Sequence, residues 1–240
     1  MKLPTLVEGR MVQRYKRFLA DVDFGGEVET THCPNPGAMT GLKQPGMRVW
    51  CSVSPNKNRK LPKTLELVEA DGIMVGINTN LPNRLVHEAL KEGLIPRFRP
   101  WPVIEPESTY EKGTRFDFKL SCPDTGGHLY LEVKNVHLNR PDGPNPGASE
   151  FPDSVTARGA KHLRKLAEIA EAGGNAAMLY VIQRDDGDRF ALAADIDPVY
   201  AQAFEYARNA GVMMEAWSCS VSPQRISISK PVRIELAGEE

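Results

Sequence analysis

The sequence is poor in cysteine, has no long hydrophobic run and carries almost no net charge. Its four cysteines lie far apart and form no C-x-x-C pair, which argues against a zinc site or a disulfide framework and favours reduced thiols. No run approaches the roughly 20 apolar residues that span a bilayer, and the opening MKLPTLVEGR lacks the apolar stretch of a secretory signal. We therefore expect a cytoplasmic protein that does not enter a membrane.

The formal charge of -1 gives no sign of a polyanionic partner, but the charge is spread unevenly. Residues 1–80 hold 11 Lys and Arg against 8 Asp and Glu, a net of +3, which leaves 19 against 23, or -4, in the remainder. A mildly basic module precedes a mildly acidic one. The 240 residues, 41% of them hydrophobic, are enough for one large domain or two modest ones.

Residues 6–80 have the pattern of short strands broken by Gly and Pro. Apolar residues alternate at 18–24 and again at 49–53, and no helix is indicated. About five strands in so short a segment suit a small β-barrel, of which the OB-fold is one type. Two basic runs are either solvated faces or nucleic-acid contacts, and they contain Arg14, Lys16 and Arg17 in the first and Lys57, Arg59 and Lys60 in the second.

The pattern changes at residue 81, where we place the boundary between a barrel domain, 1–80, and a second domain, 81–240. The segment 81–93 predicts a short helix, with Pro82 in its first turn and Gly93 at its end. Further elements follow in order: a strand at 95–101, two strand-like runs within 115–136, a long helix capped by Asp153 or Ser154 and containing Val155, a buried strand AAMLYVIQ, a helix from Asp197-Pro198 to Gly211, and a strand VMMEAW. This alternation predicts an α/β (α+β) mixed sheet flanked by helices.

The two strand-like runs within RFDFKLSCPDTGGHLYLEVKNV, residues 115–136, carry charge among apolar residues. Glu132 and Lys134 share one face of their strand, and an antiparallel pairing can bring Asp117 beside them, although the sequence leaves the register open. Two converging carboxylates repel each other unless a hard cation such as Mg²⁺ or Mn²⁺ lies between them. The lysine can then act on a metal-bound water or on phosphate charge, and Glu88 can supply a third carboxylate. A surface salt bridge is the ordinary explanation of Glu-x-Lys.

The segment FPDSVTARGAKHLRKL, residues 151–166, predicts a helix with one basic side. Its basic residues recur at spacings of three, four and seven, and they are Arg158, Lys161, His162 and Lys165. Such a stripe beside a metal site suits backbone phosphates, and a solvated helix face explains it equally well. The spacing does not decide whether His162 is a general acid, a phosphate contact or a packing residue.

These motifs, together with HCPNPGAMTG (32–41) and NTNLPNRLVHEAL (78–90), closely resemble the sugar fermentation stimulation protein A family. The match runs from about residue 10 to residue 220. The resemblance implies an OB-like barrel followed by a domain of the PD-(D/E)xK nuclease superfamily, and a protein associated with DNA binding and with regulation of sugar metabolism, maltose use in particular.

Carried over to this sequence, the resemblance makes Asp117 and Glu132 look like the metal-binding acids of that superfamily, Lys134 like its catalytic lysine and Glu88 like its helix acid. One departure is visible, because Arg115-Phe116 stands where the superfamily's proline would precede Asp117. The superfamily tolerates that change.

Three functions therefore remain open. The first is a Mg²⁺- or Mn²⁺-dependent nuclease that acts on DNA with little sequence preference, and the second is a DNA-binding regulator that keeps the nuclease fold without cleaving. The third is a module that binds RNA or single-stranded nucleic acid through the barrel alone. No helix-turn-helix signature is evident, so reading of bases by a recognition helix is not expected. The oligomeric state is left undetermined.

Overall fold

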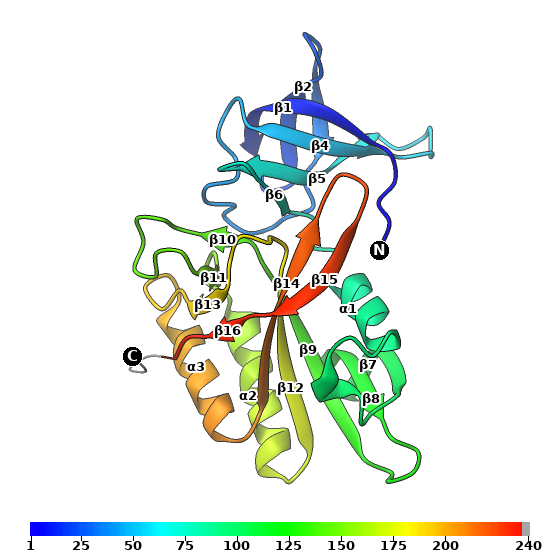
Figure 1. The fold of residues 1–240 in the computed structure, drawn as a ribbon, viewed down its shortest axis with the longest axis vertical. Helices are drawn as coiled ribbons and strands as arrows, with labels where there is room; N and C mark the ends of the chain where they lie inside the picture. The colour runs from blue at the N-terminus through cyan, green and yellow to red at the C-terminus, as the bar shows by residue number, and fades with distance from the viewer. Residues whose placement is uncertain (237–240) are drawn as a thin grey trace.

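The first part of the chain folds as a small β-barrel. In the computed structural model, which describes residues 1–236, six strands follow the order β3-β2-β1-β4-β5-β6, and the pairing of His32 with Thr64 brings β3 against β5. The strands are β1 (Leu6–Tyr15), β2 (Leu19–Asp23), β3 (Val28–His32), β4 (Arg48–Val53), β5 (Lys63–Ala70) and β6 (Ile73–Gly76). The barrel forms the upper part of the molecule in Figure 1.

Alternation along the barrel strands produces its core. Ala20 and Val22 of β2 are fully buried, as are Val49 and Cys51 of β4, and they belong to one apolar cluster. The run at residues 14–17 spans the end of β1 and the turn to β2, in which Lys16 and Arg17 adopt positive φ angles of 47° and 60°. All four cysteines are unpaired.

The second part of the chain is built on a six-stranded sheet of order β15-β14-β12-β9-β8-β7. Its strands are β7 (Val103–Glu111), β8 (Thr114–Ser121), β9 (His128–Val136), β12 (Asn175–Ile182), β14 (Met213–Val221) and β15 (Ile226–Pro231). The central strands β9, β12 and β14 are parallel, whereas the outer pairs are antiparallel. The predicted mixed sheet is confirmed.

Helices cover both faces of this sheet, with α1 (Pro82–Lys91) on one face and α2 (Ala157–Glu171) and α3 (Pro198–Asn209) on the other (Figure 1). Strand β12 is buried on both sides because alternate residues enter different cores. Leu179 lies in the α1-side cluster, and Tyr180 lies in the cluster of α2 and α3. The barrel residues Trp50 and Leu67 join the α1-side cluster, so this core is shared by the barrel and the sheet.

Two predicted elements were wrong in detail. The predicted strand at 95–101 is replaced by a short 3-10 helix, η1 (Pro96–Phe98), and β7 begins only after Pro102. Closely spaced prolines lack the backbone N–H that a sheet ladder needs. Helix α2 starts later than predicted, since Thr156 caps it by accepting from the Gly159 N–H, and Val155 stays outside the helix with 74% of its surface exposed.

A small sheet and the first residues connect these parts. The small sheet has the order β10-β11-β13-β16 and consists of β10 (Leu138–Asn139), β11 (Ser149–Phe151), β13 (Arg189–Leu192) and β16 (Arg233–Ile234). Before entering the barrel, the chain runs along β15, where Lys2 pairs with Arg225. Within residues 1–236, no helix has the length and apolar character needed to cross a bilayer.

The carboxylate of Asp197 holds the starts of both long helices. One oxygen accepts from the Tyr200 N–H of α3 at 2.9 Å, and the other accepts from the Thr156 N–H at 2.7 Å. We predict that Asp197→Ala lowers the free energy of unfolding by about 2–4 kcal/mol, because a cap is lost and a second N–H loses its partner. Urea denaturation measures the change. Asp188→Ala, at a side chain that is 87% exposed, is the control, and an equal effect of the two substitutions would contradict this role.

Candidate functional site

The strands β8 and β9 stop pairing with each other next to Asp117. Their ladder runs from the Ser121–His128 pair to the Phe118–Leu131 pair. Beyond it, Oδ2 of Asp117 accepts from the Val133 N–H at 2.8 Å, so a side-chain oxygen partners a backbone donor of β9 next to the end of the ladder. The packing also changes at this point of β8, since Phe118 packs in the α1-side core and Phe116 packs in the opposite core.

The other oxygen of Asp117 is held by α1. Oδ1 accepts from the Asn83 side-chain amide at 2.7 Å. Both donors are neutral, so each oxygen of the carboxylate accepts one hydrogen bond while the charge is not cancelled. Sequence analysis missed Asn83, although its place in the first turn of a helix that precedes the two strands was a signal that could have identified it.

Glu132 lies on the α2 side of β9 and is 3% exposed. Its Oε1 accepts from Lys134 Nζ at 2.5 Å and also contacts Nδ1 of His162 from α2. Its Oε2 is buried and has no hydrogen-bond partner among the described residues. The structure therefore brings Glu132, Lys134 and His162 together and leaves one carboxylate oxygen without a partner among the described residues.

The two acids have opposite electrostatic environments. Burial raises the pKa of Asp117, and the charge of Glu132 raises it further, against the opposing hydrogen bonds from Val133 and Asn83. Burial alone would also raise the pKa of Glu132, but the hydrogen bond from His162 and the charge of Lys134 outweigh burial and lower it. Glu132 is thus the readily ionised carboxyl of the pair, and the charge of Asp117 is poorly compensated.

This donor set fits a hard cation held by few protein ligands. Among residues 1–236, no group of three or more His, Cys, Asp or Glu side chains is placed to hold a metal ion. Mg²⁺ commonly binds through one or two carboxylates and keeps several waters. The unpartnered Oε2 of Glu132 and the undercompensated charge of Asp117 satisfy that requirement.

Glu88 is directed elsewhere. Its carboxylate pairs with the N-terminal ammonium of Met1, and its side chain is 39% exposed. The contact that α1 makes with Asp117 comes from Asn83. The structure therefore gives Glu88, the predicted third metal ligand, a partner at the chain terminus instead of at the two acids.

The predicted nucleic-acid contacts fall in separate places. Arg158, Lys161 and His162 line a cavity of about 360 Å³ with Arg115, on the side of the site where α2 lies. Lys165 pairs with Glu111 and Glu168. Among the barrel residues, Arg14 lies near the end of β1, and Lys16 and Arg17 lie in the β1–β2 turn. The exposed connection between β4 and β5 carries Lys57, Arg59 and Lys60.

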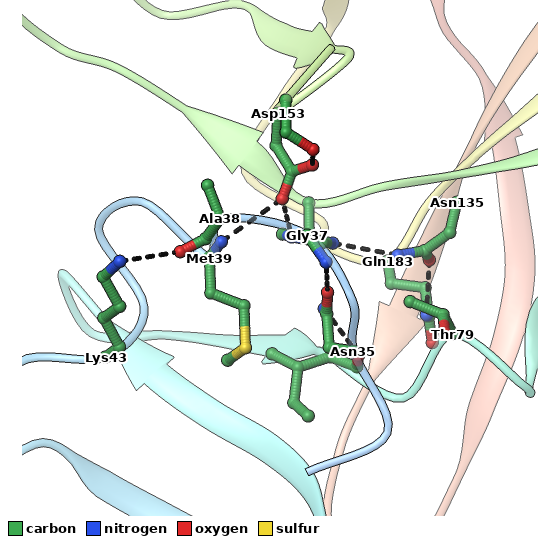
Figure 2. A network of polar contacts seen from close by, with 12 residues as sticks. Asn35, Gly37, Ala38, Met39, Lys43, Thr79, Asn135, Asp153 and Gln183 are labelled. Atoms are coloured by element: carbon green, nitrogen blue, oxygen red, sulfur yellow. Dashed lines mark hydrogen bonds and ion pairs between the residues drawn. The ribbon is translucent and has the colours of Figure 1, made fainter. Parts of the chain in front are cut away.

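A chain of polar contacts links the site strand to the barrel, and Figure 2 shows its two ends, Gln183 with Asn135 and Asp153 with Met39. The Gln183 amide donates to Asn135 Oδ1 at 2.6 Å, and the Asn135 amide contacts His137 Nδ1 at 2.9 Å. His137 Nε2 lies 3.3 Å from an Asp153 oxygen, which also accepts from the Met39 N–H of the barrel at 3.2 Å. Asp153 therefore joins the two parts and does not cap α2 as predicted.

Gly37 lies against the Asp153 carboxylate at this junction. A Cβ at that position would lie 2.2 Å from an oxygen of Asp153, so a larger residue would displace this carboxylate from its contact with the Met39 N–H. The close approach of the Asp153 carboxylate to the backbone explains the glycine in the motif HCPNPGAMTG.

Comparison with known proteins accounts for nearly the whole chain. Residues 12–77 match a family model described as the SfsA N-terminal OB domain, and residues 80–225 match one described as the sugar fermentation stimulation protein RE domain. The predicted OB-like barrel is thereby confirmed.

Curated relatives and a solved structure agree with the family models. The sugar fermentation stimulation protein homolog of Maricaulis maris is 48% identical over 99% of this chain and 100% of its own length. The homolog of Agrobacterium fabrum is 46% identical over 97% of this chain and 95% of its own length. The structure of Pyrococcus furiosus SfsA in complex with Ca²⁺ shares the fold, with a TM-score of 0.86 at 22% identity over 98% of both chains. This chain belongs to the sugar fermentation stimulation protein (SfsA) family.

Proposed function

We propose that this protein is a metal-dependent nuclease that cleaves DNA phosphodiesters with little sequence preference. The observation that carries the proposal is the buried Asp117–Glu132 pair, in which one carboxylate oxygen lacks a partner and Lys134 lies within hydrogen-bonding distance. Buried, undercompensated acids cost folding free energy, which is characteristic of a functional site. Pyrococcus furiosus SfsA forms a complex with Ca²⁺, a hard cation that takes oxygen ligands, and this supports the same class of ion here.

The residues of the site have distinct roles in this proposal. Asp117 and Glu132 hold Mg²⁺ or Mn²⁺, which when bound lowers the pKa of a water and neutralises phosphate charge. Asn83 and the Val133 N–H fix the orientation of Asp117, and His162 fixes that of Glu132. Lys134 exchanges its bond to Glu132 for one to a phosphate oxygen or an attacking water, so it supplies positive charge where negative charge grows.

The DNA contacts proposed here are those of the basic residues near the site and on the barrel. Arg158 and Lys161 are exposed beside His162 and suit backbone phosphates. With a net charge of only -1, the protein should bind DNA modestly and with strong salt dependence. The name of the relatives connects the family with sugar fermentation, and a regulatory role in sugar use, in the cytoplasm, is part of the same proposal.

A second candidate is a DNA-binding regulator that does not cleave. The observation in its favour is that α1 presents the neutral Asn83 to Asp117 and directs Glu88 to Met1, which leaves two carboxylates at the site. Cleavage assays decide between the two functions.

We predict that labelled DNA is cut with Mg²⁺ or Mn²⁺ and remains intact with EDTA. Asp117→Asn and Lys134→Ala each should slow cleavage at least about 100-fold, because each removes charge stabilisation that acts in the transition state. The initial rate on single-stranded DNA, duplex DNA and RNA is the measurement. DNA binding by the wild type without cleavage in either metal would favour the regulator.

Glu88→Gln is the matched comparison for these variants. Since Glu88 contacts Met1 and not the site acids, we predict a cleavage rate within about threefold of the wild type, far from the loss expected when a transition-state contact is removed. A loss of cleavage rate as large as that of Asp117→Asn would show that Glu88 takes part in metal binding.

Metal affinity should rise with pH. The raised pKa of Asp117 means that the folded protein keeps a proton on this carboxyl at pH values where an ordinary aspartate, with a pKa of about 3.9, has lost it. A cation must displace that proton, so Mn²⁺ should bind more tightly as pH rises through the folded pKa and level off above it. Calorimetric titrations at a series of pH values above 4 test this, and an affinity that stays constant or falls as pH rises would contradict it.

A further inference from the structure

A second polar cavity lies between the barrel and the sheet domain. It has a volume of about 630 Å³, within the range of about 300–1,000 Å³ that is typical of small-molecule sites. The barrel contributes Arg14, Arg17 and Lys43 to its wall, and the second domain contributes Asn135, His137 and Asp153. The site already described uses none of these residues directly.

Arg14 is a fixed cation in this wall. Its Nη2 donates to three backbone carbonyls, those of Arg17, Asn35 and Gly37, at 2.7–2.9 Å. Its Nε is buried and has no hydrogen-bond partner among the described residues. The guanidinium also lies close enough to the Cys33 thiol to oppose the rise in thiol pKa that burial causes. Arg14 is therefore held in place by neutral groups, and its positive charge is not cancelled.

Two exposed cations accompany it. They are Arg17 and Lys43, and the Lys43 ammonium donates to the carbonyl of Ala38. Within residues 1–236, neither of them nor Arg14 forms an ion pair with a carboxylate. The acid on the opposite wall, Asp153, is already engaged by His137 and the Met39 N–H. The cavity thus concentrates positive charge that no described residue neutralises.

We propose that this cavity binds a phosphate group carried by a nucleotide. Three cations converging on one space exceed what a single carboxylate ligand needs, and they match the charge and the several oxygens of a phosphate. The exposed apolar residues Pro36 and Val155 line the same cavity and suit contact with a sugar or base. A free 5′-phosphate and a backbone phosphate share this chemistry.

The position of the cavity connects it with the proposed nuclease site, on which this part of the inference rests. Asn135 lines the cavity and directly follows Lys134, whose ammonium contacts Glu132. Adjacent Cα atoms are about 3.8 Å apart, but successive side chains of a strand point to opposite faces of the sheet, so the cavity and the Lys134 ammonium flank β9 from its two faces. A nucleic-acid strand that crosses β9 then places one phosphate in the cavity and a neighbouring one near Lys134.

The test compares two double variants that remove the same charge from the N-terminal part of the chain. Arg17→Gln with Lys43→Gln removes two of the three cations of the cavity and keeps Arg14, which supports its loop. Lys2→Gln with Arg10→Gln removes two exposed cations of the same N-terminal part of the chain that lie outside the cavity and are not among the proposed DNA contacts. Binding of a labelled single-stranded 12-nucleotide DNA is measured by fluorescence anisotropy in EDTA over a range of salt concentrations. Inorganic phosphate and thymidine 5′-monophosphate are titrated by calorimetry as the free-phosphate arms.

We expect the cavity variant to bind DNA about tenfold more weakly at low salt, and its plot of log K against log salt to be shallower by about 1.4, since each phosphate contact on a single strand contributes about 0.7. The control variant should change either quantity by less than half as much. If the wild type also binds a free-phosphate probe that the cavity variant does not bind, the site accepts phosphate ends. If only DNA binding is affected, it holds backbone phosphate.

Equal losses in the two variants, or a cavity variant that binds all probes like the wild type, would overturn the proposal. Because EDTA removes the metal and binding is measured without cleavage, failure of the nuclease assay leaves this result unaffected. The two proposals therefore fail separately.

Discussion

The buried carboxylate of Asp117 is the constraint on which the site depends. It lies where β8 leaves β9, accepts one bond from the Val133 N–H and one from Asn83, and carries a charge that neither donor cancels. Burial and the nearby Glu132 both raise its pKa, so the fold keeps this carboxyl in a position where its charged form is disfavoured. The apolar cores on both faces of the sheet supply the stability that allows such a group to remain buried.

Glu132 is the complementary partner in this arrangement. Lys134 from the same strand and His162 from α2 hold one of its oxygens and keep it ionised, while its second oxygen has no partner among the described residues. Glu132 is therefore stabilised by Lys134 and His162, and the charge of Asp117 is left undercompensated. A cation binding between them would compensate Asp117 without competing for the existing contacts of Glu132.

The barrel is joined to this site through polar contacts as well as through a shared apolar core. Gln183, Asn135, His137 and Asp153 form a continuous path from β9 to the Met39 N–H, and Trp50 packs in the core of the sheet domain. Gly37 allows the close approach of Asp153. The cations of the barrel cavity are consequently held at a defined position relative to Lys134, which is what a strand bound across both parts requires.

Local pattern in the sequence determined the elements and much of the site: the barrel strands, the helix at 82–91, and the clustering of Glu132 with Lys134 all follow from periodicities of two or 3.6 residues. Tertiary structure decided what periodicity does not encode. The rotation of α1 about its axis presents Asn83 and directs Glu88 to Met1, and the end of the β8–β9 ladder, not strand alternation, places Asp117. Asp153 looked like a helix cap because its partners, Met39 and His137, are both distant from it in sequence. Contacts between segments far apart in the chain depend on packing, and only the folded molecule specifies it.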